Sequence, residues 1–321
     1  FDGVTTAIYD PETGTWRNPV PAPLQFIYFT GEGDNVERVV YPAPAMPRLV
    51  ADTNGLVHTL WKGPAGEETG IQPQLHSRLR LGDTAWTDPD EIAESISAWA
   101  LTSAPTGTIT LIYARPIESA EFPAGLYAKQ SADEGQTWTE PRLLRPSRYV
   151  RSYTADQLNL TVAAADEAGA VAAWDDPRRD RGTTARTITD TWSVPALITT
   201  TVPDLRPPDG LYPHHPRAVR IGADRHLIWE NAAAFSGCQL YRQTVLAPTA
   251  DAPALGDPVR VLPDLRTCPE SLRIEGSLLV LGEGTDTLTL AAWDAEAGAF
   301  SEPPTVRLTF DDPETGARIT L

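Results

Sequence analysis

The sequence contains little lysine, cysteine or methionine, and it has no long hydrophobic run. Of 321 residues, two are Lys, two are Cys and one is Met. No apolar stretch approaches the roughly 20 residues of a membrane-spanning helix, so we expect no insertion into a membrane. Neither cysteine belongs to a CxxC or a Cys/His cluster of zinc-ligand spacing, and we therefore expect neither a metal nor another cofactor.

Positive charge is also scarce. Acidic residues outnumber Lys and Arg by 43 to 26, which gives a formal net charge of -17. Proteins that bind nucleic acids neutralise phosphates with clustered basic side chains, so this balance argues against a nucleic-acid partner. The hydrophobic fraction of 41%, with 9 Trp, 9 Tyr and 7 Phe, is typical of a folded globular chain.

Hairpin patterns repeat along the chain. The segment PRLVADTNGLVHTLW (47–61) alternates apolar and polar residues around a DTNG turn, as a half-buried β-hairpin does. Similar hairpins recur, each followed by a loop and a second hairpin, and Trp86, Trp138 and Trp192 mark the second hairpin at spacings of 52 and 54 residues. Such a period with four strands per repeat indicates a β-propeller.

We therefore predict an all-β fold, a six-bladed β-propeller of four-stranded antiparallel blades, in a single domain over residues 1–321. The predicted blades cover about 1–45, 46–90, 96–144, 156–199, 214–262 and 268–308. The motif DPETG occurs at 10–14 and again at 312–316, so residues 309–321 are predicted to pair with the N-terminal blade and close the ring.

One turn has a specific composition. In SADEGQTW (131–138), the residues Ser131, Asp133, Gly135, Thr137 and Trp138 match every specified position of S-x-D-x-G-x-T-W. A carboxylate and a hydroxyl accept hydrogen bonds from unpaired N–H groups of a tight turn, glycine permits a positive φ, and Trp fills space across the strands. These residues therefore predict a structural turn rather than a catalytic centre.

This motif resembles the Asp box, or BNR repeat, of the sialidase-like β-propellers. The resemblance implies a sialidase-like fold in which the box lies on the face away from the ligand. Function is then expected on the opposite face, in the loops between second and third strands and in the connections between blades. The Arg-Ile-Pro signature of true sialidases is absent from this sequence. Arg115, Arg178 or Arg179, and Arg266 come from different loops and could form another carboxylate-binding trio, although nothing in their spacing selects them.

Aromatic, acidic and basic residues in those loops are the predicted ligand-binding residues: Arg115, Trp174, Asp175, Asp176, Arg178, Arg179, Tyr212, His214, His215, Trp229, Glu230 and Asn231. The alternative is structural, since aromatics at strand ends pack between blades and DDPRRDR is typical of a solvated ion-pair network. Nothing in their spacing selects a catalytic set.

The sequence favours a non-catalytic, secreted or cell-surface module that binds a glycan or a surface protein, assembles with itself, or belongs to a larger protein. The alternative is an exo-acting glycoside hydrolase of sialidase-like type that uses a carboxylate pair or a Tyr/Glu pair. Cys238 and Cys268 are predicted either to bridge adjacent blades or to be two buried thiols. Phe1 in place of Met is expected of a mature secreted protein or an excised fragment.

Overall fold

The computed structural model describes most of the predicted strands. The described residues are 5–6, 9–10, 13–16, 20–21, 26–30, 37–41, 48–52, 54–62, 73–80, 83, 85–116, 119, 121–146, 158–164, 170–179, 185–194, 213–231, 238–246, 254–261, 271–275, 278–283, 287–301, 305–307, 309–311 and 318–320. Within some strands only the backbone is described. This part of the chain holds no helix of the length and hydropathy that crossing a bilayer requires.

The chain divides into two compact units, and each is built of antiparallel β-sheets. The first comprises residues 1–156 with 166–168, and the second comprises residues 157–165 with 169–321. That both units form one domain stays a prediction.

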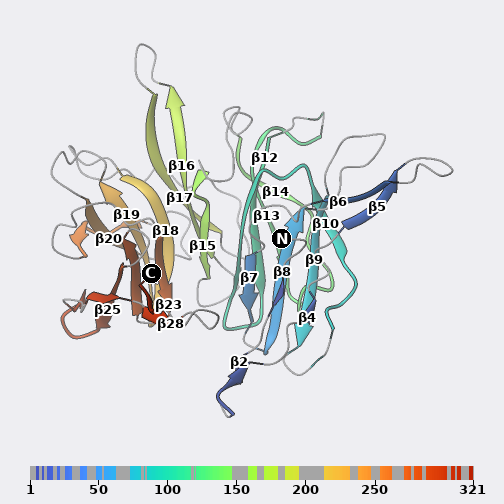
Figure 1. The fold of residues 1–321 in the computed structure, drawn as a ribbon. Helices are drawn as coiled ribbons and strands as arrows, with labels where there is room; N and C mark the ends of the chain where they lie inside the picture. Colours follow the sequence, from blue (N-terminus) through green and yellow to red (C-terminus); the bar gives the residue numbers. More distant parts are fainter. Residues whose placement is uncertain are drawn as a thin grey trace. The chain divides into compact units, whose positions relative to one another are not determined.

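Two four-stranded sheets dominate the first unit (Figure 1). One has β7 (Arg48–Ala51), β8 (Leu56–Lys62), β9 (Pro73–Arg80) and β10 (Asp90–Glu94). The other has β11 (Ala98–Ser103), β12 (Ile109–Arg115), β13 (Gly125–Ser131) and β14 (Arg142–Pro146). In both, each strand pairs with the next in the chain, so the sheets are simple meanders.

Turn chemistry and alternation explain the second of these sheets. Gly107 adopts φ 85° in the turn between β11 and β12, where the Ala104 N–H donates to the Thr108 carbonyl over 2.8 Å. Because successive strands reverse direction, the turn after β13 lies at the same end as this turn. We call the end of a sheet that carries these turns its turn end. The opposite end, which carries the loop between the second and third strands, is called its loop end.

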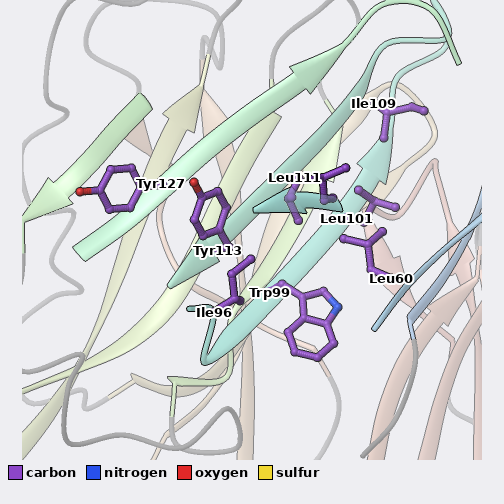
Figure 2. Close-up of a cluster of buried hydrophobic side chains, with 9 residues drawn as sticks. Leu60, Ile96, Trp99, Leu101, Ile109, Leu111, Tyr113 and Tyr127 are labelled. Atoms are coloured by element: carbon purple, nitrogen blue, oxygen red, sulfur yellow. The ribbon is translucent and has the colours of Figure 1, made fainter. Parts of the chain in front are cut away.

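The core of the first unit lies between its two sheets. Leu60 of β8 and Ile92 of β10 pack with Trp99 of β11, Leu111 of β12 and Tyr127 of β13, all at most 7% exposed (Figure 2). Each such side chain contributes on the order of 1.5–3 kcal/mol through removal from water.

The second unit contains one three-stranded and two five-stranded sheets. The first has β15 (Thr161–Ala164), β16 (Ala170–Arg179) and β17 (Ala185–Val194). The next has β18 (Pro213–Ile221), β19 (Asp224–Asn231), β20 (Gln239–Leu246), β21 (Ala254–Leu255) and β22 (Val259–Arg260). The last has β23 (Ser271–Glu275), β24 (Leu278–Glu283), β25 (Thr287–Asp294), β26 (Ala299–Phe300) and β27 (Thr305–Arg307).

The β18–β22 sheet is buried on both faces. Ile228 and Leu240 pack with Leu279 and Leu281 of β24 on one face. Leu227 and Trp229 pack with Ala163, Ala173 and Ala218 on the other. The alternation of side chains along β19 thus sends even-numbered residues toward one neighbouring sheet and odd-numbered residues toward the other.

The prediction of six blades is wrong for the residues that the structure describes, which contain four sheets of four or more strands. The predicted first blade consists instead of separate two-stranded ladders, because its hairpins share no hydrogen-bonded edge. They are β1 (Thr5–Thr6) with β4 (Val20–Pro21), β2 (Tyr9–Asp10) with β3 (Thr15–Trp16), and β5 (Phe26–Thr30) with β6 (Glu37–Tyr41).

The predicted ring closure is also not seen. In the described residues, β29 (Arg318–Thr320) pairs with β28 (Thr309–Asp311) rather than with an N-terminal strand. A local hairpin closes a short loop and loses less chain entropy than pairing across the whole sequence.

Candidate functional site

The turn at residues 131–138 is held by its own side chains. Gly135 N–H donates to Ser131 Oγ over 2.8 Å, and the Ser131 hydroxyl donates to Asp133 Oδ1 over 2.8 Å. Thr137 donates its N–H to Asp133 Oδ1 over 2.9 Å and its hydroxyl to Oδ2 over 2.5 Å. These bonds lower the pKa of Asp133 to about 2, chiefly through Thr137. The carboxylate is engaged in the turn, which is its structural role.

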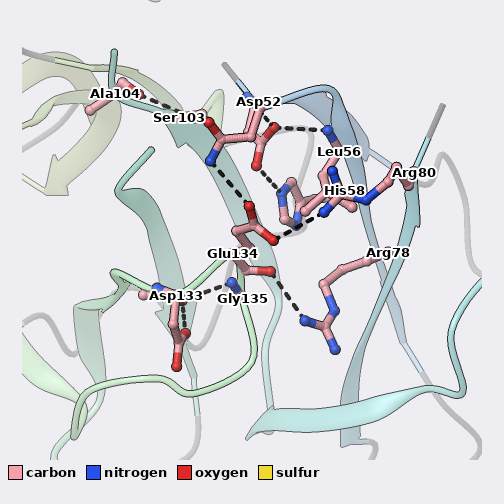
Figure 3. A network of polar contacts seen from close by, with 12 residues as sticks. Asp52, Leu56, His58, Arg78, Arg80, Ser103, Ala104, Asp133, Glu134 and Gly135 are labelled. Carbon is pink, nitrogen blue, oxygen red and sulfur yellow. Dashed lines mark hydrogen bonds and ion pairs between the residues drawn. The ribbon is translucent and has the colours of Figure 1, made fainter. Parts of the chain in front are cut away.

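This turn packs against a buried polar chain in the adjacent sheet. His58 Nε2 lies 3.3 Å from Asp52 Oδ2 (Figure 3). His58 Nδ1 lies 3.1 Å from His76 Nε2. Both imidazoles are 0% exposed, and burial lowers the pKa of His58 and lowers that of His76 to about 3. The neutral His76 ring donates a hydrogen bond to His58, and the neutral His58 ring donates one to Asp52. All three residues are buried, so this chain of hydrogen bonds has a structural role and presents no group to a ligand.

Glu134, also in the turn, makes further contacts with that sheet. Its carbonyl accepts from Arg78 Nη1 over 3.3 Å, and its carboxylate accepts from Asn54 Nδ2 over 3.2 Å and from Arg80 over 3.4 Å (Figure 3). The turn at residues 131–138 therefore connects the two sheets of the first unit at their turn ends.

A different arrangement lies at the loop end of the β18–β22 sheet. His215 Nδ1 is 2.9 Å from Glu230 Oε2. The His215 side chain is 51% exposed, whereas that of Glu230 is only 9% exposed. A carboxylate has no proton to donate, so Nδ1–H is the donor and Nε2 carries the lone pair of the neutral ring. The pair combines a reachable imidazole with a sheltered acid.

A bulge in β18 places His215. The register with β19 shifts between His214 and Arg217, and His215 adopts φ 48°. A positive φ is uncommon for histidine and persists only where the surroundings fix it. Thr161 of β15 supplies part of that support, because its hydroxyl donates to the Pro216 carbonyl over 3.3 Å and accepts from the Ala218 N–H over 2.9 Å.

The opposite face of the same strand ends carries neutral polar groups. Asn231 Nδ2 donates to Gln239 Oε1 over 3.1 Å, and the Tyr241 hydroxyl donates to the same oxygen over 3.4 Å. Beneath them Tyr241 stacks on Trp229, with ring centroids 4.8 Å apart. We call Asn231, Gln239 and Tyr241 the amide row.

The structure brings together only some of the predicted ligand-binding residues. His215 and Glu230 are paired, and Asn231 follows Glu230 directly. Trp174 and Trp229 are 2% and 1% exposed, so the prediction that they present their rings to a ligand is wrong, since both are core residues. Arg115 lies elsewhere, in the first unit, with its guanidinium 4.9 Å from the centre of the Phe122 ring.

The remaining candidates are described in part or not at all. The prediction that the residues from Trp174 to Arg179 lie in a loop is wrong, because β16 continues to Arg179 and pairs with β17. Pairing in a long hairpin gives the backbone N–H and C=O groups of these residues hydrogen-bond partners that a loop would not provide. The side chains of Asp175, Asp176, Arg178, Arg179 and His214 lie outside the described residues, as does all of Tyr212.

Sequence reasoning missed Gln239 and Tyr241. Their signal is the register of the β19–β20 hairpin, which sets Gln239 opposite Asn231 and Tyr241 opposite Trp229. Among the described residues, no three His, Cys, Asp or Glu side chains gather closely enough to hold a metal ion.

Cys238 is disulfide-bonded and buried. The chain's other cysteine, Cys268, lies outside the described residues, so the bridge between them stays a prediction.

Comparison with known proteins supports the fold. No protein-family model and no curated protein matches the chain. An ulvan lyase of a new polysaccharide lyase family, solved bound to GlcA(1-4)Rha3S and also reported without mention of a ligand, matches 94% of this chain and 78% of its own. The TM-score is 0.53 at 13% identity. A microbial sialidase matches more weakly, with a TM-score of 0.45 at 12% identity.

The chain resembles the sialidase-like β-propellers. At such low identity the likeness concerns the fold alone, and its antiparallel sheets are propeller-like blades.

Proposed function

We propose that this protein binds an acidic polysaccharide at the loop end of the β18–β22 sheet and cleaves it by β-elimination, with His215 as the general base. The observation that carries the proposal is the 2.9 Å contact between the half-exposed His215 ring and the sheltered Glu230 carboxylate. A carboxylate on Nδ1 fixes the tautomer and stabilises the imidazolium that forms when Nε2 takes a proton.

The reaction follows from that geometry. Nε2 of His215 removes the proton on the sugar carbon next to the carboxylate, and the electron pair forms a double bond to the adjacent carbon. The glycosidic C–O bond on that carbon breaks, and its oxygen leaves with a proton taken from a donor or from water. The products are a new chain end and an unsaturated sugar acid, and no bond to the enzyme forms.

Two considerations favour elimination over hydrolysis. Most glycoside hydrolases use two carboxylates that lie on either side of the scissile bond. Among the predicted ligand-binding residues, Glu230 is the acidic residue whose side chain is described, and it is hydrogen-bonded to His215. The ulvan lyase that shares the fold is bound to a saccharide that contains GlcA. A hydrolase that uses a carboxylate pair needs a second carboxylate, and the acidic residues of the other loops, Asp175, Asp176, Glu270 and Glu283, do not have described side chains.

A second candidate function is glycan binding without catalysis. The amide row favours it, because the partly exposed Gln239 and Tyr241 offer hydrogen bonds to sugar hydroxyls, and the row contains no Asp, Glu, His, Lys or Arg. We also propose that the protein acts outside the cell or at its surface. The disulfide at Cys238 supports this location, since such bonds persist in oxidising compartments.

One assay separates these functions. The protein is incubated with uronate-containing and neutral polysaccharides while ultraviolet absorbance and new reducing ends are both recorded. Elimination gives reducing ends together with absorbance from the unsaturated product, whereas hydrolysis gives reducing ends alone. A binding module gives neither, but its migration is retarded by the polysaccharide in affinity electrophoresis. Absence of absorbance with every uronate polymer would overturn the lyase proposal.

The His215→Ala variant completes the assay. Loss of a general base lowers turnover by about 10²–10⁴-fold, whereas contacts made only by the amide row remain. Unchanged turnover in this variant would remove His215 from the mechanism.

A further inference from the structure

The amide row differs from an ordinary patch of surface amides because one oxygen, Gln239 Oε1, accepts two hydrogen bonds within the row. Gln239 Oε1 accepts from Asn231 Nδ2 and from the Tyr241 hydroxyl. Both donors hold the oxygen toward the strands, so the Gln239 NH₂ group is turned away from them. Gln239 and Tyr241 are partly exposed. The orientation is thus fixed before any ligand arrives.

A second glutamine on the same strand shows what a purely structural amide looks like here. Gln243 lies four residues beyond Gln239 on the same face of β20 and is 3% exposed. Its Oε1 accepts from Trp229 Nε1 over 2.8 Å, and its Nε2 donates to the Gly256 carbonyl over 3.1 Å. Among the described residues, no acceptor is found for the Gln239 amide nitrogen.

The groups of the row match a sugar hydroxyl. Gln239 supplies an N–H donor, and the Tyr241 oxygen, whose proton is directed at Gln239, retains lone pairs that accept. The Tyr241 ring is held by its stacking on buried Trp229 and offers an apolar surface beside these groups. The row contains no Asp, Glu, His, Lys or Arg, so nothing in it favours a charged sugar.

The position relative to His215 matters as well. Glu230 and Asn231 are consecutive residues at the end of β19, and strand alternation sends them to opposite faces of the sheet. The charged pair and the neutral row therefore lie on opposite faces of the sheet, at the end of the same strand.

We infer that Gln239 and Tyr241 form a subsite for an uncharged sugar, next to the position at which His215 acts on a charged one. The inference deepens the proposed function, on which it rests for the identity of the neighbouring sugar. It assigns the polymer a composition in which an acidic residue is flanked by a neutral one. Polymers made of uronate alone would fill the subsite with a carboxylate that finds no cation in the row.

Binding of single sugars tests the subsite without requiring turnover. Saturation-transfer NMR is recorded with L-rhamnose, D-glucose and D-glucuronate on the wild type, Gln239→Leu, Tyr241→Phe and His215→Ala. We expect neutral-sugar signals on the wild type and on His215→Ala, loss of these signals in Gln239→Leu, and about tenfold weaker binding in Tyr241→Phe, as for a lost hydrogen bond. Glucuronate signals are expected to depend on His215 and not on Gln239.

Folding is checked by the Gln243→Leu variant. Gln239→Leu is expected to unfold at the wild-type temperature, whereas Gln243→Leu, which leaves Trp229 Nε1 and the Gly256 carbonyl unpaired, is expected to unfold several degrees lower. Neutral-sugar signals that are equal in Gln239→Leu and wild type, or absent from the wild type, would overturn the subsite. Failure of the lyase proposal appears separately, as absence of unsaturated product while neutral-sugar binding persists.

Discussion

His76 lies directly beneath Gly135, so close that a Cβ on the glycine would stand 2.6 Å from Cε1 of the ring. The glycine also has φ 77°. Residue 135 therefore has to be glycine for two reasons. Its backbone conformation disfavours other residues, and the buried His76 of the adjacent sheet leaves no room for a side chain.

We expect Gly135→Ala to destabilise the protein more than Gly55→Ala. Gly55 has nearly the same φ, 78°, but a Cβ there meets nothing within 4 Å. Gly55→Ala should cost about 1 kcal/mol for its backbone conformation alone, and Gly135→Ala roughly 1–3 kcal/mol more for the steric clash. Urea denaturation of both variants measures the difference, and equal losses would show that His76 moves aside freely.

Stability should fall as the pH is lowered from about 6.5 to about 3. The pKa of His76 drops from 6.5 to about 3 in the folded protein because burial disfavours the charged ring, and Arg78 and His58 act in the same direction. The unfolded chain therefore binds protons that the folded chain does not, and stability is lost as the pH falls through this window.

The double variant His58→Leu/His76→Leu tests this source of acid sensitivity. It leaves Asp52, Arg78 and Glu134 as the charged groups around the site. We expect its urea midpoint to vary less with pH than that of the wild type over the same range. An identical pH dependence would place the sensitivity elsewhere.

Asp133→Asn should lower stability without lowering any glycan activity. The amide removes one acceptor, which leaves either the Thr137 hydroxyl or the Thr137 and Ser131 donors without their partner, at a cost of about 1 kcal/mol. The low pKa of Asp133, about 2 rather than 3.8, also means that its stabilising contribution disappears as the pH falls between these values. Loss of turnover at unchanged stability would instead support a catalytic aspartate.

Glu230→Gln should reduce turnover by at least about tenfold and leave neutral-sugar binding intact. The amide keeps the shape of the side chain but does not stabilise the charged imidazole that forms during proton abstraction. Rates on a uronate polymer, together with saturation-transfer signals from L-rhamnose, report the two effects separately. Undiminished turnover would mean that Glu230 is only a packing residue.

Reduction of the disulfide at Cys238 should destabilise the second unit. If the partner is Cys268, the enclosed loop of about 30 residues corresponds to about 3–4 kcal/mol in the chain-entropy model. Peptide mapping without reduction identifies the partner, and thermal unfolding with and without reductant measures the effect. Two unlinked peptides would remove the support for an oxidising location.

The hairpin repeat and the box turn were predictable because they depend on local order. Gly107 and the acceptor Asp133 act within a few residues of their own position, and alternation is a property of each strand. The number of blades was not predictable in this way, since it depends on whether hairpins share an edge. Residues 5–41 contain the expected hairpins but form no four-stranded sheet in the described structure.

The candidate site shows the same division. The segments that contain His215 and Glu230 could be predicted from the sequence, because they lie at the ends of strand patterns and carry polar, titratable side chains. Trp229 was misread, since a Trp that ends a strand looks the same whether it faces a ligand or Tyr241. Gln239 was overlooked because a single glutamine in a strand has no distinguishing pattern.

Strand alternation, the turn chemistry of residues 131–138 and the acidic composition follow from residue type and near neighbours, so they can be predicted from the sequence. Two other features are visible only in the folded chain: a bulge in β18 brings His215 to Glu230, and Asn231 and Tyr241 both donate to Gln239. Register shifts and contacts between sheets bring together residues distant in the chain, and their energies come from packing that no local pattern encodes.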